Sequence, residues 1–291
     1  MTDSAATLNR GVLLVLGSIL VGVSMDALAK HLTAFMAVGM LVWSRYFGHA
    51  LLMVVWALGT RRLVWRTTAP WLQWVRSVLL VASTAQLYAA LVHLPLSTTA
   101  AIGMVHPLIT TALAVPILGE VVGWRRWCAV LVGLVGAVII IRPSFEVLGW
   151  PVLLPLGMAF GYASYTVATR ALARVDSSAT TFAWTPVAGA IAATLYLPWG
   201  WQTPQTTAEV GQLLMLGVLG ATAHLLYVMA LRLVPAGVIG AFSYSGLVWA
   251  GLLGFVLFAE VPDRWTLLGA GLIAGSGLYV WARERRRIAG T

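Results

Sequence analysis

The stretch LPLSTTAAIGMVHP occupies residues 94–107, and Glu120 follows it at the end of the same apolar segment. The same plan returns 140 residues later, where a proline opens a second apolar segment and Glu260 follows its end. At this offset, without a gap, Pro95 aligns with Pro235 and Glu120 aligns with Glu260. An acid that closes a long apolar segment twice at one fixed distance indicates an internal duplication of the chain.

Composition places the chain in a membrane. Of its 291 residues, 60% are apolar and 9% are charged. In a soluble domain about a quarter of the residues are charged. The formal net charge of +9 could suggest a nucleic-acid partner, but its distribution along the chain argues otherwise. The single cysteine, Cys128, excludes an internal disulfide.

Ten apolar segments approach or exceed the length of about 20 residues that spans a bilayer as a helix. We therefore predict an all-α integral membrane protein with ten transmembrane helices, in two five-helix repeats at residues 1–143 and 144–291. Because five is an odd number, the second repeat must enter the membrane from the opposite side and is inverted. The expected spans are 11–30, 36–58, 71–92, 97–117, 124–141, 150–170, 179–199, 209–231, 236–258 and 265–282.

Basic residues set the orientation, because they concentrate in cytoplasmic loops. With the N-terminus inside, 13 of the 18 basic residues lie on the inner face and three on the outer face. Both termini are then cytoplasmic, and we expect a multi-pass protein of the bacterial inner membrane. The asymmetry also explains the net charge, so the basic tail after residue 282 is expected at the bilayer surface and no nucleic-acid partner is expected.

Five residues carry a family resemblance: Pro107 and Glu120 in the fourth segment, Glu260 after the ninth, and Lys30 and Arg45 in the first two. With ten helices as five plus five, the chain resembles the EamA-type carriers of the drug/metabolite transporter superfamily. The resemblance implies export of amino acids and other metabolites, and within the family the chain is most similar to the YddG-type exporters of aromatic amino acids. Leu247 replaces the proline that the family pattern has in the ninth segment, so a break in that helix lacks its usual cause.

Polar and aromatic residues inside the segments are the candidates for a substrate pathway. A polar group in lipid needs an internal partner, so such residues either line a cavity or form hydrogen bonds between packed helices. Interior aromatic rings suit a wall for an aromatic or bulky apolar substrate, and they suit plain packing equally. The candidate substrate-binding residues are Tyr88, Thr99, His106, Thr110, Tyr165, His224, Tyr227, Ser243, Tyr244 and Trp249.

Charged residues within the membrane are costly and usually functional. Asp26 and Lys30 are four residues apart on one helix face, which predicts either an ion pair or contact with the two charges of a zwitterion, or a proton relay. Arg45 would bind a substrate carboxylate or pair with Asp26. Arg76 is expected to snorkel to the inner surface. Glu120 and Glu260 are expected to have structural roles, as helix caps or as partners of loop arginines.

These patterns predict a secondary transporter that exports small metabolites, chiefly aromatic or bulky apolar amino acids, by alternating access between the repeats. The alternative is a channel-like or uniport permease for other small metabolites or drugs. No zinc-protease, nucleophile-elbow or phosphate-loop motif occurs, so we expect neither an enzyme nor an ATP-driven pump. We expect no metal and no cofactor. The expected partners are a small-molecule substrate and the lipid bilayer, and we expect a monomer.

Overall fold

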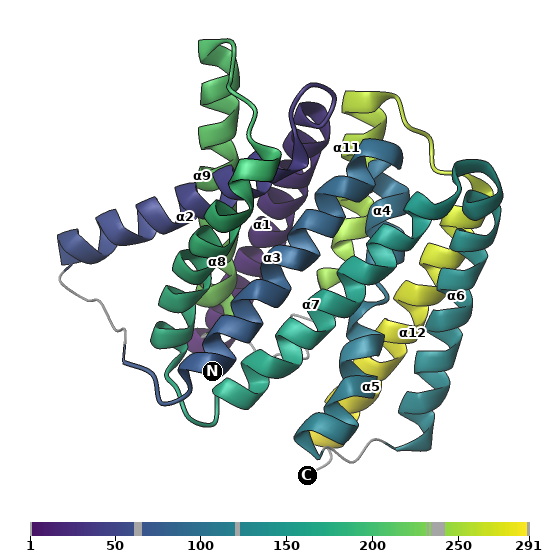
Figure 1. Cartoon of the computed structure of the whole chain (residues 1–291). Coiled ribbons are helices and arrows are strands. Elements are labelled where there is room, and N and C mark those ends of the chain that lie inside the picture. The colour runs from purple at the N-terminus through teal and green to yellow at the C-terminus, as the bar shows by residue number, and fades with distance from the viewer. Residues whose placement is uncertain (1, 61–65, 120–122, 232, 234–241, 290–291) are drawn as a thin grey trace.

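The computed structural model describes residues 2–60, 66–119, 123–231, 233 and 242–289. Within these ranges the chain forms helices and connecting turns, and no strand occurs (Figure 1). The helices are α1 (Thr2–Leu32), α2 (Val38–Thr60), α3 (Pro70–His93), α4 (Leu96–Gly103), α5 (His106–Leu118), α6 (Trp124–Leu148), η1 (Trp150–Val152), α7 (Leu153–Leu172), α8 (Ser178–Gly200), α9 (Thr207–Leu231), α11 (Ser245–Phe258) and α12 (Arg264–Ala289).

The helices have the length and the surface of a membrane protein. In the described part of the chain, six segments are long and apolar enough to cross a bilayer: Asn9–Leu32, Val38–Val55, Pro70–His93, Leu96–Leu118, Trp150–Leu172 and Thr207–Tyr227. Large apolar side chains point outward, such as Leu58 at 74% exposure and Leu195 at 70%. In water such a surface would favour aggregation, but lipid tails are as apolar as these side chains.

The fourth expected segment is divided into two helices. α4 ends at Gly103, Met104 and Val105 form a turn, and α5 begins at His106. Pro107 lies in the first turn of α5, where its missing N–H needs no partner and its fixed φ suits a helix start. The proline that the sequence placed within one helix therefore stands at the start of a second helix.

The second copy shows a break at the equivalent position. Tyr244 forms a turn before α11 begins at Ser245, although Leu247 takes the place of the proline. The helix ends correspond as well, because Gly119 and Ala259 both adopt the left-handed conformation, with φ of 69° and 55°. An alanine there carries a steric cost that glycine avoids. The backbone thus repeats at the 140-residue offset at both ends of this element.

Helices from the two halves of the sequence pack against one another. α1 runs along α9, α3 runs along α7, and α6 pairs with α12 (Figure 1). α2 approaches α9 closely, because a Cβ added to Gly48 would lie 2.8 Å from the Cα of Gly217. The Ser44 hydroxyl donates to the Leu213 carbonyl across the same contact, at 2.5 Å. Small residues at such contacts are the usual means of close packing between membrane helices.

Two turns attach to distant parts of the chain. Asp176, between α7 and α8, accepts hydrogen bonds from the Thr67 hydroxyl, the Thr68 amide at 3.1 Å and the Gln73 side chain at 2.8 Å. Partial desolvation raises the pKa of Asp176, but these hydrogen bonds outweigh it and lower the pKa below its ordinary value. The Asp176 contact therefore fastens the α7–α8 turn to the start of α3.

The second turn, between α1 and α2, is held by Gln202. The side-chain oxygen of Gln202 accepts from the Ala37 amide at 2.7 Å, and its side-chain nitrogen donates to the Phe35 carbonyl at 2.7 Å. Gln202 lies in the segment that precedes α9. The α1–α2 turn is thus joined to the approach to α9, as the α7–α8 turn is joined to the approach to α3.

Candidate functional site

A cluster of polar and aromatic side chains surrounds Arg45 in the middle of α2. The Arg45 guanidinium donates to the Thr84 hydroxyl on α3 at 3.3 Å. The hydroxyl of Tyr46 lies 2.8 Å from the same Thr84 oxygen. The guanidinium carbon lies 5.5 Å from the ring centroid of Tyr46 and 5.9 Å from that of Tyr88, within the range of cation–π attraction.

Asp26 faces this cluster from α1. Its charge and that of Arg45 act on one another, and Asp26 also acts on Tyr88. No ion pair within 4.0 Å joins Asp26 to Arg45 or to Lys30, although all three residues lie in described helices. One carboxylate oxygen of Asp26, Oδ1, is buried without a hydrogen-bond partner. The expected ion pair between Asp26 and Lys30 is therefore wrong.

A row of rings continues the cluster along α7. The rings of His106 and Tyr162 meet edge to face at 4.8 Å between centroids, and Tyr162 lies 5.6 Å from Tyr165. Tyr162 interacts electrostatically with Arg45 and with Tyr227 on α9. These five side chains are partly exposed although they belong to membrane helices: Arg45, His106, Tyr162, Tyr165 and Tyr227. The arrangement joins polar and aromatic groups of α2, α5, α7 and α9.

Two histidines complete the cluster where α2 meets α9. His49 and His224 lie 5.4 Å apart between ring centroids, and each interacts electrostatically with Arg45. His49 is 8% exposed. We refer below to Asp26, Arg45, Tyr46, His49, Thr84, Tyr88, Tyr162, Tyr165, His224 and Tyr227 as the central cluster.

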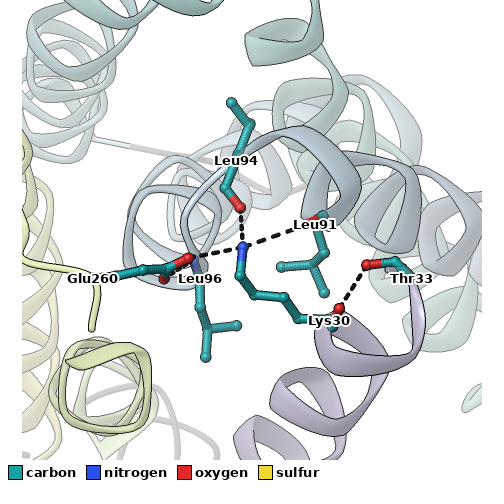
Figure 2. Close-up of polar contacts among 6 residues, drawn as sticks. All are labelled: Lys30, Thr33, Leu91, Leu94, Leu96 and Glu260. Atoms are coloured by element: carbon teal, nitrogen blue, oxygen red, sulfur yellow. Dashed lines mark hydrogen bonds and ion pairs between the residues drawn. The ribbon is translucent and has the colours of Figure 1, made fainter. Parts of the chain in front are cut away.

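Lys30, near the end of α1, makes a separate set of polar contacts with Glu260 and with the start of α4 (Figure 2). Its ammonium forms an ion pair with Glu260 Oε1 at 2.9 Å and donates to the carbonyls of Leu94 at 2.6 Å and Leu91 at 3.5 Å. Glu260 Oε2 accepts from the backbone amide of Leu96 at 2.8 Å, which is the first residue of α4. Glu260 is thus a helix cap and an ion-pair partner, and the partner is a lysine instead of a loop arginine.

Arg76 is buried instead of snorkelling. It is 1% exposed on α3, and its guanidinium donates to the Thr181 carbonyl at 2.8 Å and to the Thr185 hydroxyl. Its guanidinium carbon lies 5.2 Å from the ring centroid of Tyr165. The side chain turns into the contact between α3, α7 and α8, where hydroxyl and carbonyl groups replace water as its partners.

The remaining candidates have other surroundings. Thr99 is 1% exposed within α4, and the Thr110 hydroxyl donates to the His106 carbonyl of its own helix at 2.8 Å. Tyr244 is buried among apolar residues that include Ile102. Ser243, beside the break in the second copy, and Trp249, on α11, are partly exposed. Glu120 lies outside the described residues.

Several members of the central cluster were absent from the candidate list. Tyr46 follows Arg45 directly, and His49 lies one helical turn after Arg45. Thr84 lies one helical turn before Tyr88, and Tyr162 lies just under one turn before Tyr165. Helical spacing from Arg45 was the signal that could have found His49, which lies four residues later; the same spacing does not point to Tyr46. Among the described residues, no group of three His, Cys, Asp or Glu side chains could hold a metal ion.

Comparison with known proteins gives a consistent family match. The profile of the EamA-like transporter family matches residues 9–142 and again residues 149–281. The chain is 30% identical over 227 residues to a riboflavin transporter of Rhizobium johnstonii, covering 76% of this chain and 74% of that protein. It is 25% identical over 289 residues to an S-adenosylmethionine uptake transporter of Rickettsia bellii, covering 99% of both. It is 28% identical over 273 residues to the pseudopaline exporter CntI of Pseudomonas aeruginosa, covering 91% of this chain and 94% of that one.

Proposed function

The chain belongs to the EamA-like transporter family, and from this membership we propose that it is a secondary transporter for small metabolites that carry a flat aromatic ring. The family is one of membrane transporters, so the chain is a multi-pass transporter and not an enzyme. We propose in addition that the chain has an inverted-repeat architecture with alternating access, that its substrate site lies within the bundle, and that its substrates share one chemical class.

The proposed architecture is ten transmembrane helices in two inverted repeats of five. The family profile matches twice, once in each half of the chain. The turn before α5 and the turn before α11 fall at equivalent positions, and so do the left-handed caps at Gly119 and Ala259. The contact of α1 with α9 corresponds, under the same offset, to the contact of α7 with α3. Such symmetry supports an architecture that presents the two halves to opposite sides of the bilayer.

Alternating access requires contacts that close each end of the pathway in turn. The Lys30–Glu260 ion pair and the Gln202 contact lie at the end of the bundle that the basic residues assign to the outside. The Asp176 contact with Thr68 lies at the end assigned to the cytoplasm, together with both termini. Contacts at both ends support rocking of one repeat against the other, in the bacterial inner membrane.

The observation that carries the substrate site is the central cluster. It brings Arg45 and its tyrosine neighbours together with rings of α5, α7 and α9, and these helices come from both halves of the chain. Substrate sites of inverted-repeat transporters lie where the halves meet near mid-membrane. Aromatic side chains stack on a flat ring, and an arginine binds a polar group attached to it.

The names of the relatives point to flat-ring metabolites more than to amino-acid export. Riboflavin and S-adenosylmethionine both contain a planar nitrogen heterocycle, and these are the solutes named for two of the relatives. None of the three relatives described above is named as an exporter of aromatic amino acids, so that branch is not supported. The names include both an uptake transporter and an exporter, so the direction of transport follows from the gradients and not from the family.

The test is transport by the purified chain in liposomes. Labelled riboflavin, S-adenosylmethionine and tryptophan are offered with and without a pH gradient, and with and without unlabelled solute inside. Accelerated exchange against internal solute would support a carrier, whereas equilibration without any counterflow would favour the channel-like permease. Arg45→Gln and Tyr162→Ala should reduce transport at least about tenfold, whereas Ser24→Ala, whose hydroxyl bonds only within α1, should not. No transport of any of these solutes would contradict the proposal.

A further inference from the structure

Contacts at the outer end of the bundle converge on one ammonium group (Figure 2). Lys30 Nζ forms an ion pair with Glu260 Oε1 at 2.9 Å. It also donates to the carbonyls of Leu94 at 2.6 Å and Leu91 at 3.5 Å. The Leu91 carbonyl is available to it, because the residue four positions later, which would supply the helical donor, is Pro95 and has no N–H. The ammonium thus joins α1 to the end of α3 and to the residue that follows α11.

The same carboxylate holds α11 against α4. Glu260 Oε2 accepts from the Leu96 amide at 2.8 Å, and the Glu260 amide donates to the Gly254 carbonyl of α11 at 3.1 Å. The Leu96 side chain is 2% exposed, and a Cβ added to Gly254 would lie 3.8 Å from the Leu96 Cβ. Opening of the outer end between α4 and α11 therefore requires that the Lys30–Glu260 pair breaks.

A second acid lies one helical turn from Lys30. Asp26 is four residues earlier on α1, and an acid that precedes a lysine by four residues has the favourable order for an ion pair. No ion pair within 4.0 Å joins the two, although both lie in the described part of α1, and Asp26 Oδ1 is buried without a hydrogen-bond partner. A buried carboxylate oxygen without a partner is costly inside a membrane. The oxygen lacks the lysine because Glu260 holds it.

We propose that Lys30 is a two-position switch, paired with Glu260 while the outer end is closed and with Asp26 once the outer end opens. The long, flexible side chain of lysine lets its ammonium move between two acids. Because one partner replaces the other, opening does not leave the ammonium unpaired in the membrane. The Asp26–Lys30 pair that the sequence predicted then belongs to the open state. This inference rests on the proposed alternating access and names the contact that changes when the outer end opens.

Labelling of a cysteine between α4 and α11 measures the opening. In the full chain the native Cys128 is replaced by serine, Leu96→Cys supplies the reactive thiol, and a membrane-impermeant maleimide is added outside intact cells. Glu260→Gln keeps an oxygen for the amide at the start of α4 but removes the closed-state pair, so labelling should become about 10-fold faster. Adding Asp26→Asn removes the open-state pair and should slow labelling again, by about 3- to 10-fold. Glu209→Gln, which neutralises an acid at an exposed helix start, is the matched control and should not change the rate.

Opposite effects of the two acids distinguish a switch from an ion pair that is only structural. Asp26→Asn alone should also slow labelling, and this comparison decides the question if Glu260→Gln cannot be recovered. In a Lys30→Gln chain, Asp26→Asn should no longer slow labelling, because the ammonium that the acids share is gone. The switch is overturned if Asp26→Asn leaves the rate unchanged or raises it, or if Glu260→Gln speeds labelling only from the cytoplasmic side, in inside-out vesicles. Labelling needs no substrate, so the switch can fail while transport succeeds, and failure to transport any of the solutes would contradict the proposed function instead.

Discussion

Replacing Glu260 with alanine removes the ion pair of Lys30 and the acceptor at the start of α4 in one step. The side chains of Lys30 and Glu260 are 14% and 16% exposed, between the burial of a surface pair and that of a core pair. Exposed pairs contribute about 0–1 kcal/mol, and breaking a buried pair costs about 3–5 kcal/mol. We take about 1–3 kcal/mol for the pair and about 1 kcal/mol for the cap on the Leu96 amide. The expected destabilisation is then about 2–4 kcal/mol.

Thermal unfolding in detergent, followed by tryptophan fluorescence, measures this loss. Glu260→Gln keeps an oxygen for the Leu96 amide and should lose only the ion-pair part, so it should melt above Glu260→Ala. Glu209→Ala is the matched control, because Glu209 accepts from the Gln205 amide at 2.6 Å at an exposed helix start. A Glu260→Ala protein that melts with the wild type would refute the reasoning. Equal melting temperatures for the two Glu260 variants would show that the cap on the Leu96 amide makes no contribution to stability.

Three further results are expected. Gly48→Val places a Cβ 2.8 Å from the backbone of α9 and should destabilise the fold by about 1–3 kcal/mol. Gly22→Val, where an added Cβ has no atom within 4 Å, should not destabilise it, and thermal unfolding of the two variants tests the difference. The folded pKa of Asp176 lies below its unfolded value, so the stability it contributes is present above about pH 4 and is lost as the pH falls through the folded pKa. Between about pH 6 and 3 the melting temperature of Asp176→Asn should therefore fall less than that of the wild type. His106→Ala removes the 4.8 Å ring contact with Tyr162 and should lower liposome transport about 2- to 10-fold; unchanged transport would show that His106 is not part of the site.

Much of the fold was accessible from composition and spacing. Apolar runs of membrane-spanning length predicted α2, α3, α7, α8 and α9 closely, because in lipid a backbone must satisfy its own hydrogen bonds within a helix. The division of the fourth segment was not predicted as two helices, although its proline was identified. The equivalent break at Tyr244, a buried residue, forms without a proline, so the proline pattern did not predict it.

The candidate site was predicted in part. Tyr88, Tyr165, His224 and Tyr227 were singled out because polar and aromatic groups in a membrane helix need partners, and the structure places all four in the central cluster. Thr99 was chosen by the same rule and instead lies buried within α4. The rule finds residues that need a partner, but it does not say whether the partner is a substrate, a neighbouring helix or the helix itself.

The sequence by itself determined that the chain lies in lipid, where most of its helices fall, and that its two halves are alike, with Glu120 aligned with Glu260. Each of these depends on composition or on spacing along one segment. Only the tertiary structure decided that Lys30 pairs with Glu260, that Asp26 faces Arg45 without an ion pair, and that Arg76 turns inward. Helical spacing fixes which side chains share a face. Which face of another helix lies opposite depends on how helices far apart in sequence pack, and no local pattern contains that information.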